Sequence, residues 1–160
     1  MADNTATRKG ADINDSIDSS GLKGSVKVLV STVELAAAAD GDTIDFGKIP
    51  STARPLGISK VYWDDLATTG SPTLDIGLKS YLNNSVTADP DALSNGHDVT
   101  SAGSGSLAAV LAATVGDPAW DYINGVSSNP GGELEVYGSV DDAATTQTGT
   151  VTLELYYYDD

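Results

Sequence analysis

The sequence predicts an all-β protein, an antiparallel β-sandwich with a jelly roll as the expected topology. Two observations lead to this fold class. Short runs in which apolar and polar residues alternate recur along the chain, and clusters of glycine, proline, asparagine and aspartate separate them. Glycine, alanine, serine, threonine and aspartate also dominate the composition, rather than the leucine, glutamate and lysine of helical bundles. An apolar share of 40% in 160 residues is enough for one core.

The clearest strand lies near the middle of the chain. Leu74, Ile76 and Leu78 fall on one face of an extended segment. Asp75 and Lys79 fall on the other face. This alternation is typical of an antiparallel strand with one face buried and the other in water.

Two further strands are expected earlier in the chain. Residues 56–63 form one apolar candidate. In the other, the valines of residues 26–30 have the opposite parity from Val33 and Leu35. If all of these side chains enter the core, a bulge or a break is expected near Ser31–Thr32.

The chain ends in two long alternating segments, residues 133–140 and 150–158. The polar residues 141–149 between them resemble a hairpin loop. We therefore expect the two segments to pair as an antiparallel hairpin.

The last segment also predicts outward-facing aromatic side chains. Tyr156 and Tyr158 lie on the face opposite to Val151, Leu153 and Leu155. An exposed tyrosine fits the rim of a subunit interface, and equally an ordinary surface strand. The polar residues 1–24 are expected to form an extended N-terminal arm, and residues 25–160 the β-sandwich domain. The isolated apolar residues of the arm complete the set of interface candidates: Ile13, Ile17 and Leu22.

The chain is strongly acidic, with a formal net charge of -15. Residues 80–160 contain twelve acidic residues and no lysine or arginine. Such a surface repels phosphate backbones and anionic lipids, so we expect no direct nucleic-acid partner and no membrane partner. The absence of cysteine excludes disulfides and thiolate chemistry.

His97 is the single histidine and would have to serve in any Ser-His-Asp triad. It lies in the turn-like segment Asn95–Asp98, and no G-x-S-x-G nucleophile pattern accompanies it. We favour a surface-loop histidine, and therefore expect no catalytic residues and no enzyme. A small hydrolase centred on His97 is the alternative.

Two other chemistries can be drawn from the sequence. Asp40, Asp42 and Asp45 could offer oxygen ligands to Ca²⁺, but their spacing does not match an EF-hand loop. A solvated turn whose carboxylates accept main-chain hydrogen bonds is favoured, so we expect no metal and no cofactor. Trp63 and Trp120 could stack on sugar rings, although packing in the core or on a sheet face is preferred.

Three stretches, taken in order, carry a family resemblance. The first is Ala-Asp-Gly-Asp-Thr-Ile-Asp-Phe-Gly-Lys-Ile-Pro at residues 39–50, and the second is Thr-Leu-Asp-Ile-Gly-Leu at 73–78. The third is Asn-Pro-Gly-Gly-Glu-Leu at 129–134, followed by Gly-Thr-Val-Thr-Leu at 149–153. In their order and spacing they resemble the small β-rich virion structural proteins of tailed bacteriophages, the capsid decoration or cement proteins.

The resemblance implies a sandwich or jelly-roll domain on the outer surface of a virion capsid. Its partner would be the major capsid protein, whose shell it would stabilise. A homo-oligomer is expected, with a trimer as the first choice because capsids offer local threefold positions. The alternatives are a carbohydrate-binding adhesin and a tail or neck component of the virion.

Overall fold

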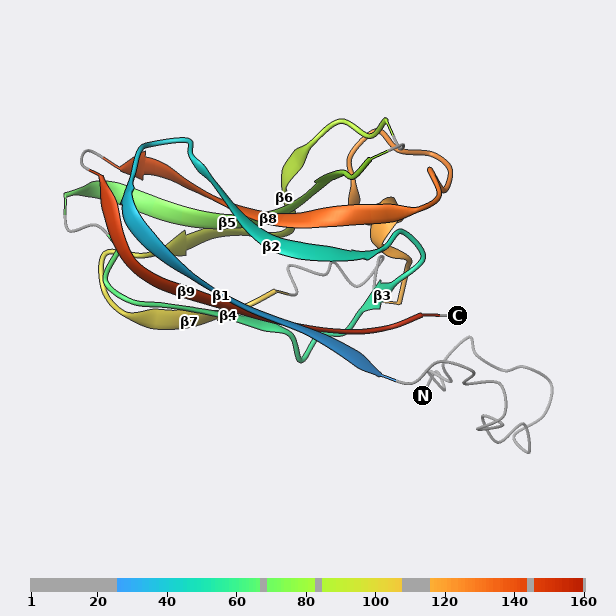
Figure 1. Cartoon of the computed structure of the whole chain (residues 1–160), viewed down its shortest axis with the longest axis horizontal. Helices are drawn as coiled ribbons and strands as arrows, with labels where there is room; N and C mark the ends of the chain where they lie inside the picture. The colour runs from blue at the N-terminus through green and yellow to red at the C-terminus, as the bar shows by residue number, and fades with distance from the viewer. Residues whose placement is uncertain (1–25, 67–68, 83–84, 108–115, 144–145, 160) are drawn as a thin grey trace, which may run out of the picture.

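The computed structural model describes residues 26–66, 69–82, 85–107, 116–143 and 146–159. Within them, nine strands form two antiparallel sheets that lie face to face (Figure 1). Sheet A has the strand order β1-β9-β4-β7, with the short β3 also paired to β9, and sheet B has the order β2-β8-β5-β6. The predicted all-β sandwich is therefore confirmed. The strands are β1 (Lys27–Ala38), β2 (Thr43–Pro50), β3 (Arg54–Pro55), β4 (Lys60–Trp63), β5 (Gly70–Ser80), β6 (Asp89–Asp98), β7 (Gly103–Ser106), β8 (Glu133–Ala143) and β9 (Gln147–Tyr158).

The path of the chain through the two sheets is that of a jelly roll. Leaving aside β3, the chain crosses to the other sheet at every connection except the one from β5 to β6, which are neighbours in sheet B. Eight strands wound in this way form the double-sheet jelly roll. Because β1 and β9 are antiparallel neighbours, the start of β1 and the end of β9 lie at the same end of the sandwich (Figure 1).

The core lies between the sheets and is filled by alternate side chains of each strand. Leu74, Ile76 and Leu78 of β5 are fully buried, as their alternation predicted. The same holds for Val151, Leu153 and Leu155 of β9, each of which is 0% exposed.

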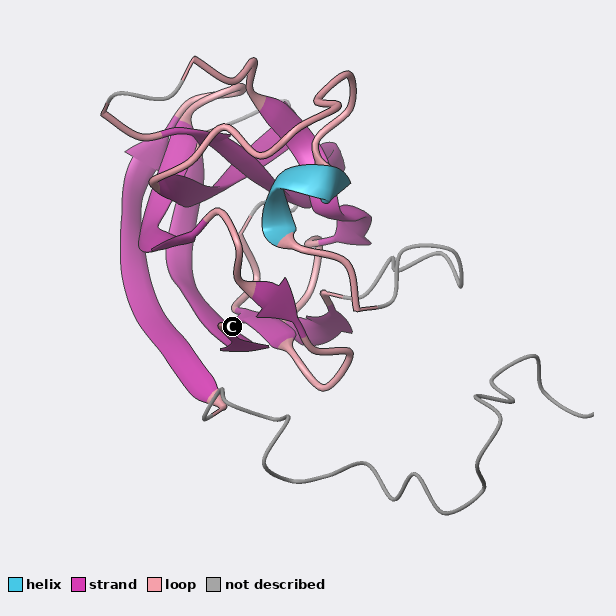
Figure 2. Ribbon diagram, turned by 90° about the vertical axis from the view of Figure 1, so that its right-hand side faces the viewer, coloured by secondary structure: helices cyan, strands magenta, loops and turns pink. Residues whose placement is uncertain are grey.

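A short 3-10 helix closes one end of the sandwich. This helix, η1 (Ala119–Tyr122), lies across the end of the two sheets (Figure 2). The Ala119 N–H donates to the Ala53 carbonyl, and the Trp120 N–H donates to the Ser51 carbonyl. These bonds attach η1 to the loop between β2 and β3, where Ala119 is buried against the core.

The bulge predicted near Ser31–Thr32 is wrong. β1 pairs with β9 without interruption from Lys27 to Ala36, and its register shifts only between Ala36 and Ala38. The expectation failed because it assumed that every valine of β1 enters the core.

The predicted C-terminal hairpin is also wrong. β8 belongs to sheet B and pairs with β2 and β5, whereas β9 belongs to sheet A. The chain therefore passes from sheet B to sheet A between Ala143 and Gln147, and Asp142, next to the end of β8, has a φ of 60°. Each strand has an apolar inner face, and this is equally compatible with strands that face each other across the core.

Two local expectations also need correction. Residues 56–63 are a strand only from Lys60, because the Ser59 N–H donates to the Leu56 carbonyl in a turn. Asn95–Gly96 lies inside β6, which accommodates it with register shifts rather than a chain reversal.

Candidate interface on sheet A

The outer face of β1 carries valine side chains that the sandwich leaves in solvent. Val26, Val28 and Val30 are 60%, 48% and 57% exposed. Leu29 points the other way, because a Cβ on Gly47 of β2 would lie 3.3 Å from Leu29 Cδ1. Since successive side chains of a strand alternate between its faces, the inward position of Leu29 places the valines outward.

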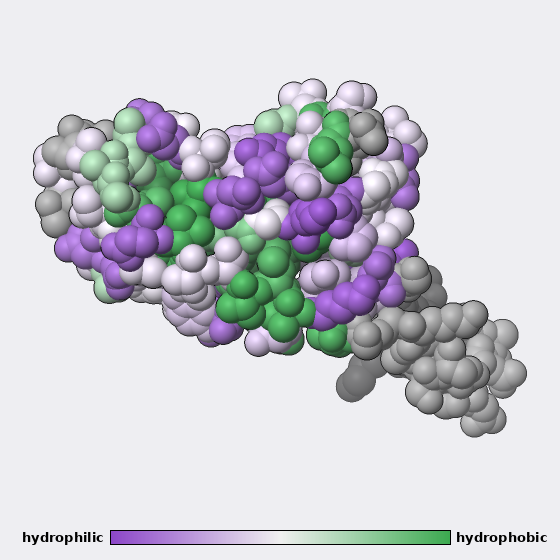
Figure 3. Space-filling view, viewed as in Figure 1, coloured by the Kyte–Doolittle hydropathy of each residue, from purple (hydrophilic) through white to green (hydrophobic). Residues whose placement is uncertain are grey.

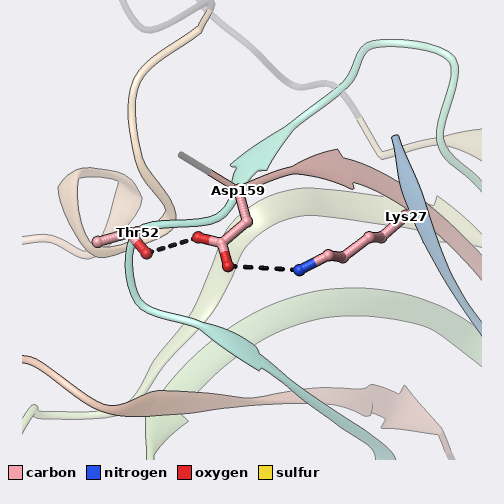
Figure 4. A network of polar contacts seen from close by, with 3 residues as sticks. All are labelled: Lys27, Thr52 and Asp159. Atoms are coloured by element: carbon pink, nitrogen blue, oxygen red, sulfur yellow. Dashed lines mark hydrogen bonds and ion pairs between the residues drawn. The ribbon is translucent and has the colours of Figure 1, made fainter. Parts of the chain in front are cut away.

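A polar network at the start of β1 joins three segments of the chain (Figure 4). Lys27 Nζ lies 3.5 Å from Asp159 Oδ2, and Thr52 Oγ1 donates to Asp159 Oδ1 at 2.8 Å. Because both charged side chains are partly exposed, the ion pair contributes only about 0–1 kcal/mol. The ion pair mainly fixes position, because it joins the start of β1 to the residue that follows β9.

The apolar surface extends from β1 across the neighbouring strands. Val28 lies directly opposite Tyr156 of β9, and directly opposed residues of an antiparallel pair share a face. Ile58, in the turn before β4, is 64% exposed. The adjacent Ser59 hydroxyl accepts from the Tyr156 N–H at 2.9 Å, which holds this turn beside β9. We call this surface the valine face; it consists of Val26, Val28, Val30, Ile58, Tyr62 and Tyr156.

Most of the exposed large hydrophobic side chains of the described residues lie on the valine face. Five of their six exposed large hydrophobic side chains belong to it, and the sixth, Leu82, follows β5 in sheet B. Figure 3 shows its hydrophobic surface over the first half of β1 and the turn before β4. Isolated exposed hydrophobic residues are normal, whereas a contiguous group marks a site of interaction.

A pair of oppositely charged side chains lies within the valine face. Glu154 of β9 lies opposite both Val30 of β1 and Lys60 of β4, in the row between Tyr156 and Tyr62. Tyr62 Oη lies 3.4 Å from Glu154 Oε2, and the pKa of Tyr62 is raised first by desolvation and then by the Glu154 charge. The valine face therefore combines exposed apolar side chains with this charged pair.

The outer face of sheet B differs from that of sheet A because its lysines form ion pairs within the chain. Lys48 Nζ lies 2.7 Å from Glu133 Oε2, and Lys79 Nζ lies 2.8 Å from Glu135 Oε1. Lys48 also lies 4.5 Å from the Tyr81 ring centroid. An open depression here is lined by Asp45, Gly47, Lys48, Tyr81 and Glu135.

The first part of β6 covers Tyr137 on this face. A Cβ on Gly77 would lie 2.2 Å from the Asp89 carbonyl oxygen and 2.6 Å from Pro90, so this part of β6 lies directly on Gly77. Tyr137, opposite Gly77 in β8, is only 5% exposed. Sheet B therefore covers its outward-facing aromatic residue with its own chain.

Two carboxyl groups of this face are partly buried. Burial raises the pKa of Asp75, although the Gly96 N–H, which donates to Asp75 Oδ1 at 2.6 Å, opposes the shift. Burial likewise raises the pKa of Asp89, whose Oδ2 accepts from the Asn124 N–H at 2.6 Å. Asp75 thus holds Gly96 of β6, and Asp89 holds the segment that follows η1.

The interpretation of His97 as a surface-loop residue is wrong. Its ring is half-buried at the end of β6, with its centroid 5.3 Å from that of Trp63. Burial lowers its pKa, against the opposing charge of Asp75. His97 Nε2 is buried without a hydrogen-bond partner among the described residues, so no serine hydroxyl there is placed to form a triad.

The aspartates considered for Ca²⁺ are engaged in turns. Asp42 Oδ2 accepts from the Ala39 N–H at 2.7 Å, and Asp45 Oδ1 accepts from the Gly47 N–H at 2.8 Å. In the part of the chain that the structure describes, no three histidine or acidic side chains, including Asp40, are grouped so that they could hold a metal ion.

The tryptophans considered for sugar stacking pack against the core. Trp63 is 8% exposed and donates from Nε1 to the Ser101 carbonyl at 3.0 Å. Trp120 is partly buried on η1. Trp63 therefore lacks the free ring face that stacking on a sugar requires.

The predicted interface residues are divided by the structure. Tyr156 belongs to the valine face, and Tyr158 lies 6.0 Å from Arg54, measured from ring centroid to Cζ. Ile13, Ile17 and Leu22 lie outside the described residues, as does the whole predicted arm, so the boundary at residue 24 stays a prediction. The valines were missed as surface residues, although the parity of Leu29, Val33 and Leu35 was a signal that could have shown it.

Comparison with known proteins gives one structural likeness. No family model matches the chain, and no curated protein matches it. A chain of the capsid asymmetric unit of cyanophage Pam1 superposes with a TM-score of 0.50 and 23% sequence identity, over 86% of each chain. At this identity the match establishes a shared fold. Among the described residues, no helix is long and apolar enough to cross a membrane.

Proposed function

We propose that this chain is a virion structural protein, a capsid decoration or cement subunit that binds the outer surface of a major capsid protein shell. The observation that carries the proposal is the fold shared, over 86% of both chains, with a chain from a cyanophage capsid. Jelly rolls also serve as lectin and cupin domains, so the fold alone does not select a capsid role. The proposal also requires a surface that fits binding to a capsid shell. The valine face is that surface.

The valine face supplies an apolar contact of the kind that a shell protein can cover. Burial of an exposed valine or isoleucine side chain contributes about 1.5–3 kcal/mol. Many copies on one particle, each contacting neighbouring shell subunits, would add avidity to this modest contact. A homo-oligomer, with a trimer as first choice, would match a local threefold position of the shell.

The charge of the chain agrees with an external position. A net charge of -15 opposes contact with packaged nucleic acid. It also keeps free copies apart, so association depends on a face where apolar contact outweighs repulsion. Sheet A offers such a face at the start of β1.

Co-sedimentation with purified empty shells from the source particle tests the proposal. The wild-type chain is expected to co-sediment saturably, and Val28→Ser/Val30→Ser to bind at least about tenfold more weakly, since tenfold corresponds to only 1.4 kcal/mol. Leu82→Ser is the matched control, because it removes an even more exposed apolar side chain outside the valine face.

Equal binding by the valine variant and the wild type would show that the valine face is not the contact. Failure of the wild-type chain to bind shells, together with saturable binding to a host surface polysaccharide, would favour the adhesin instead. Binding only to isolated tails or necks would move the chain to that part of the virion.

A further inference from the structure

The two sheets have four edges, and three of them are protected against pairing with another chain. β7 has only four residues. β2 contains a register shift between Asp45 and Gly47 and ends in Pro50. β6 contains two register shifts and Pro90. Short strands, bulges and prolines are the devices that keep sheet edges from recruiting further strands.

The fourth edge, β1, lacks these devices before the register shift between Ala36 and Ala38. It is twelve residues long, contains no proline or glycine, and pairs regularly with β9 from Lys27 to Ala36. Among the described residues, no strand pairs with its other side. A long, regular edge exposes a row of main-chain donors and acceptors that an added strand can satisfy.

We propose that residues 1–25 of a neighbouring copy add a strand to the free edge of β1. The segment enters the structure directly at Val26, beside this edge. Fully extended, 25 residues reach about 80 Å, whereas β1 needs about 40 Å of strand to cover it. The segment is therefore long enough to leave its own sandwich and lie along the next one.

Charge favours this segment over a second sandwich as the occupant of the edge. Only four of the 23 acidic residues but three of the eight basic residues lie in residues 1–25. A second sandwich brought against β1 would carry nearly all of the negative charge of the chain, whereas the segment carries almost none.

The apolar residues of the segment match the edge. Ile13 and Ile17 are four residues apart and share one face of a strand. On the outer face of sheet A their spacing matches that of Val26 and Val30, so a register with Ile17 opposite Val30 would place Ile13 opposite Val26. Passed head to tail around a ring of three copies, this contact would extend the homo-oligomer proposed above.

Cysteine cross-linking tests the proposal, since the native chain contains no cysteine. Full-length Ile17→Cys and Val30→Cys chains are mixed and oxidised mildly. We expect a disulfide-linked heterodimer to form at least about tenfold faster than with Ser104→Cys, which is exposed on β7 at the opposite edge of sheet A. A rate equal to that of the Ser104→Cys control would overturn the proposal. A chain that carries both Ile17→Cys and Val30→Cys is oxidised separately, and a disulfide that forms only within such single chains would also overturn it.

Sedimentation of two arm variants provides a second measurement that leaves the sandwich unchanged. Ile13→Asp/Ile17→Asp is expected to be monomeric at concentrations where the wild type is oligomeric. Asn14→Asp/Ser16→Asp adds the same charge on the other face of the strand and should remain oligomeric. Identical behaviour of the two variants would contradict the assigned strand face. Both experiments use the isolated chain, so their failure is distinguishable from a failure to bind shells.

Discussion

The outer faces of the two sheets differ in how they treat their large side chains. On sheet B, Tyr137 is covered by the start of β6, and Lys48 and Lys79 are paired with glutamates of β8. On sheet A, the valine face stays open to solvent along β1 and the turn before β4. Sheet B covers its large outward-facing ring with its own chain, whereas sheet A keeps apolar side chains in solvent.

This difference indicates where the molecule interacts. A contiguous exposed apolar surface favours aggregation unless a partner covers it. The outer face of sheet B offers no comparable apolar surface, and its Lys48 and Lys79 are already paired within the chain. We therefore expect substitutions on sheet B to change the stability of the fold, and substitutions on the valine face to change association.

The largest expected difference is between two tyrosines. Tyr137→Ala removes a ring that is 5% exposed and should reduce the free energy of unfolding by about 3 kcal/mol or more. Tyr156→Ala removes a half-exposed ring and should cost less than about 1 kcal/mol. Urea denaturation of both variants measures this. Equal losses would mean that sheet B does not bury its outward-facing tyrosine.

Gly77→Ala tests the cover over sheet B directly. The new Cβ would meet main-chain atoms of Asp89 and Pro90, which cannot rotate away, so a loss of about 2–3 kcal/mol is expected. Ser104→Ala, at an exposed position of β7, is the control and should change stability by less than about 0.5 kcal/mol. Thermal unfolding of the two variants gives the comparison, and a fully stable Gly77→Ala would show that β6 does not lie on Gly77.

Neighbouring positions of β1 should respond in opposite ways. Val30→Ser is expected to change the free energy of unfolding by no more than about 0.5 kcal/mol, because the side chain is in solvent in both states. Leu29→Ser, one residue earlier, should cost about 2 kcal/mol, because Leu29 packs against the core. Denaturant midpoints measure both. A costly Val30→Ser with a harmless Leu29→Ser would reverse the assigned faces of β1.

The smallest expected effect is a dependence on pH from sheet B. Folding raises the pKa of Asp75 through burial, so the native state takes up this proton at a higher pH than the unfolded chain. Ionised Asp75 therefore destabilises the native state at neutral pH, and this destabilisation is lost as the pH falls through the raised pKa toward the usual 3.8.

Asp75→Asn should accordingly gain less stability than the wild type when the pH is lowered from 7 to 4. Ser104→Ala, which changes no titratable group, is the control and should follow the wild-type curve. Stability curves measured in urea at several pH values give the result. An Asp75→Asn curve parallel to that of the wild type would show that Asp75 does not contribute to the pH dependence of stability.

Alternation of residue types was sufficient to predict the all-β sandwich and the inward faces of β5 and β9. It was sufficient there because each strand has one uniformly apolar parity, as in Val151, Leu153 and Leu155. In β1 both parities begin with apolar residues, and only the continuation of one of them through Val33 and Leu35 indicates that Leu29 packs inside and Val28 outside. The exposed valines of the valine face give β1 apolar side chains on both of its faces, unlike β5 and β9.

Long-range features were beyond the pattern for a different reason. Whether β8 and β9 pair with each other or face each other across the core depends on the partners β2, β5, β1 and β4, which are distant in sequence. His97 could not be placed either. Its half-buried position depends on Trp63 and on the space left by Gly105, whose Cβ would lie 2.2 Å from the imidazole.

Cryo-electron microscopy of purified source particles tests the central claim most directly. We expect this jelly roll on the outside of the shell, with Val28, Val30 and Ile58 covered by the major capsid protein and the outer face of sheet B in solvent. Density in which sheet B contacts the shell while the valine face is free would contradict the assigned surface. Particles that lack the chain altogether would contradict the proposed function.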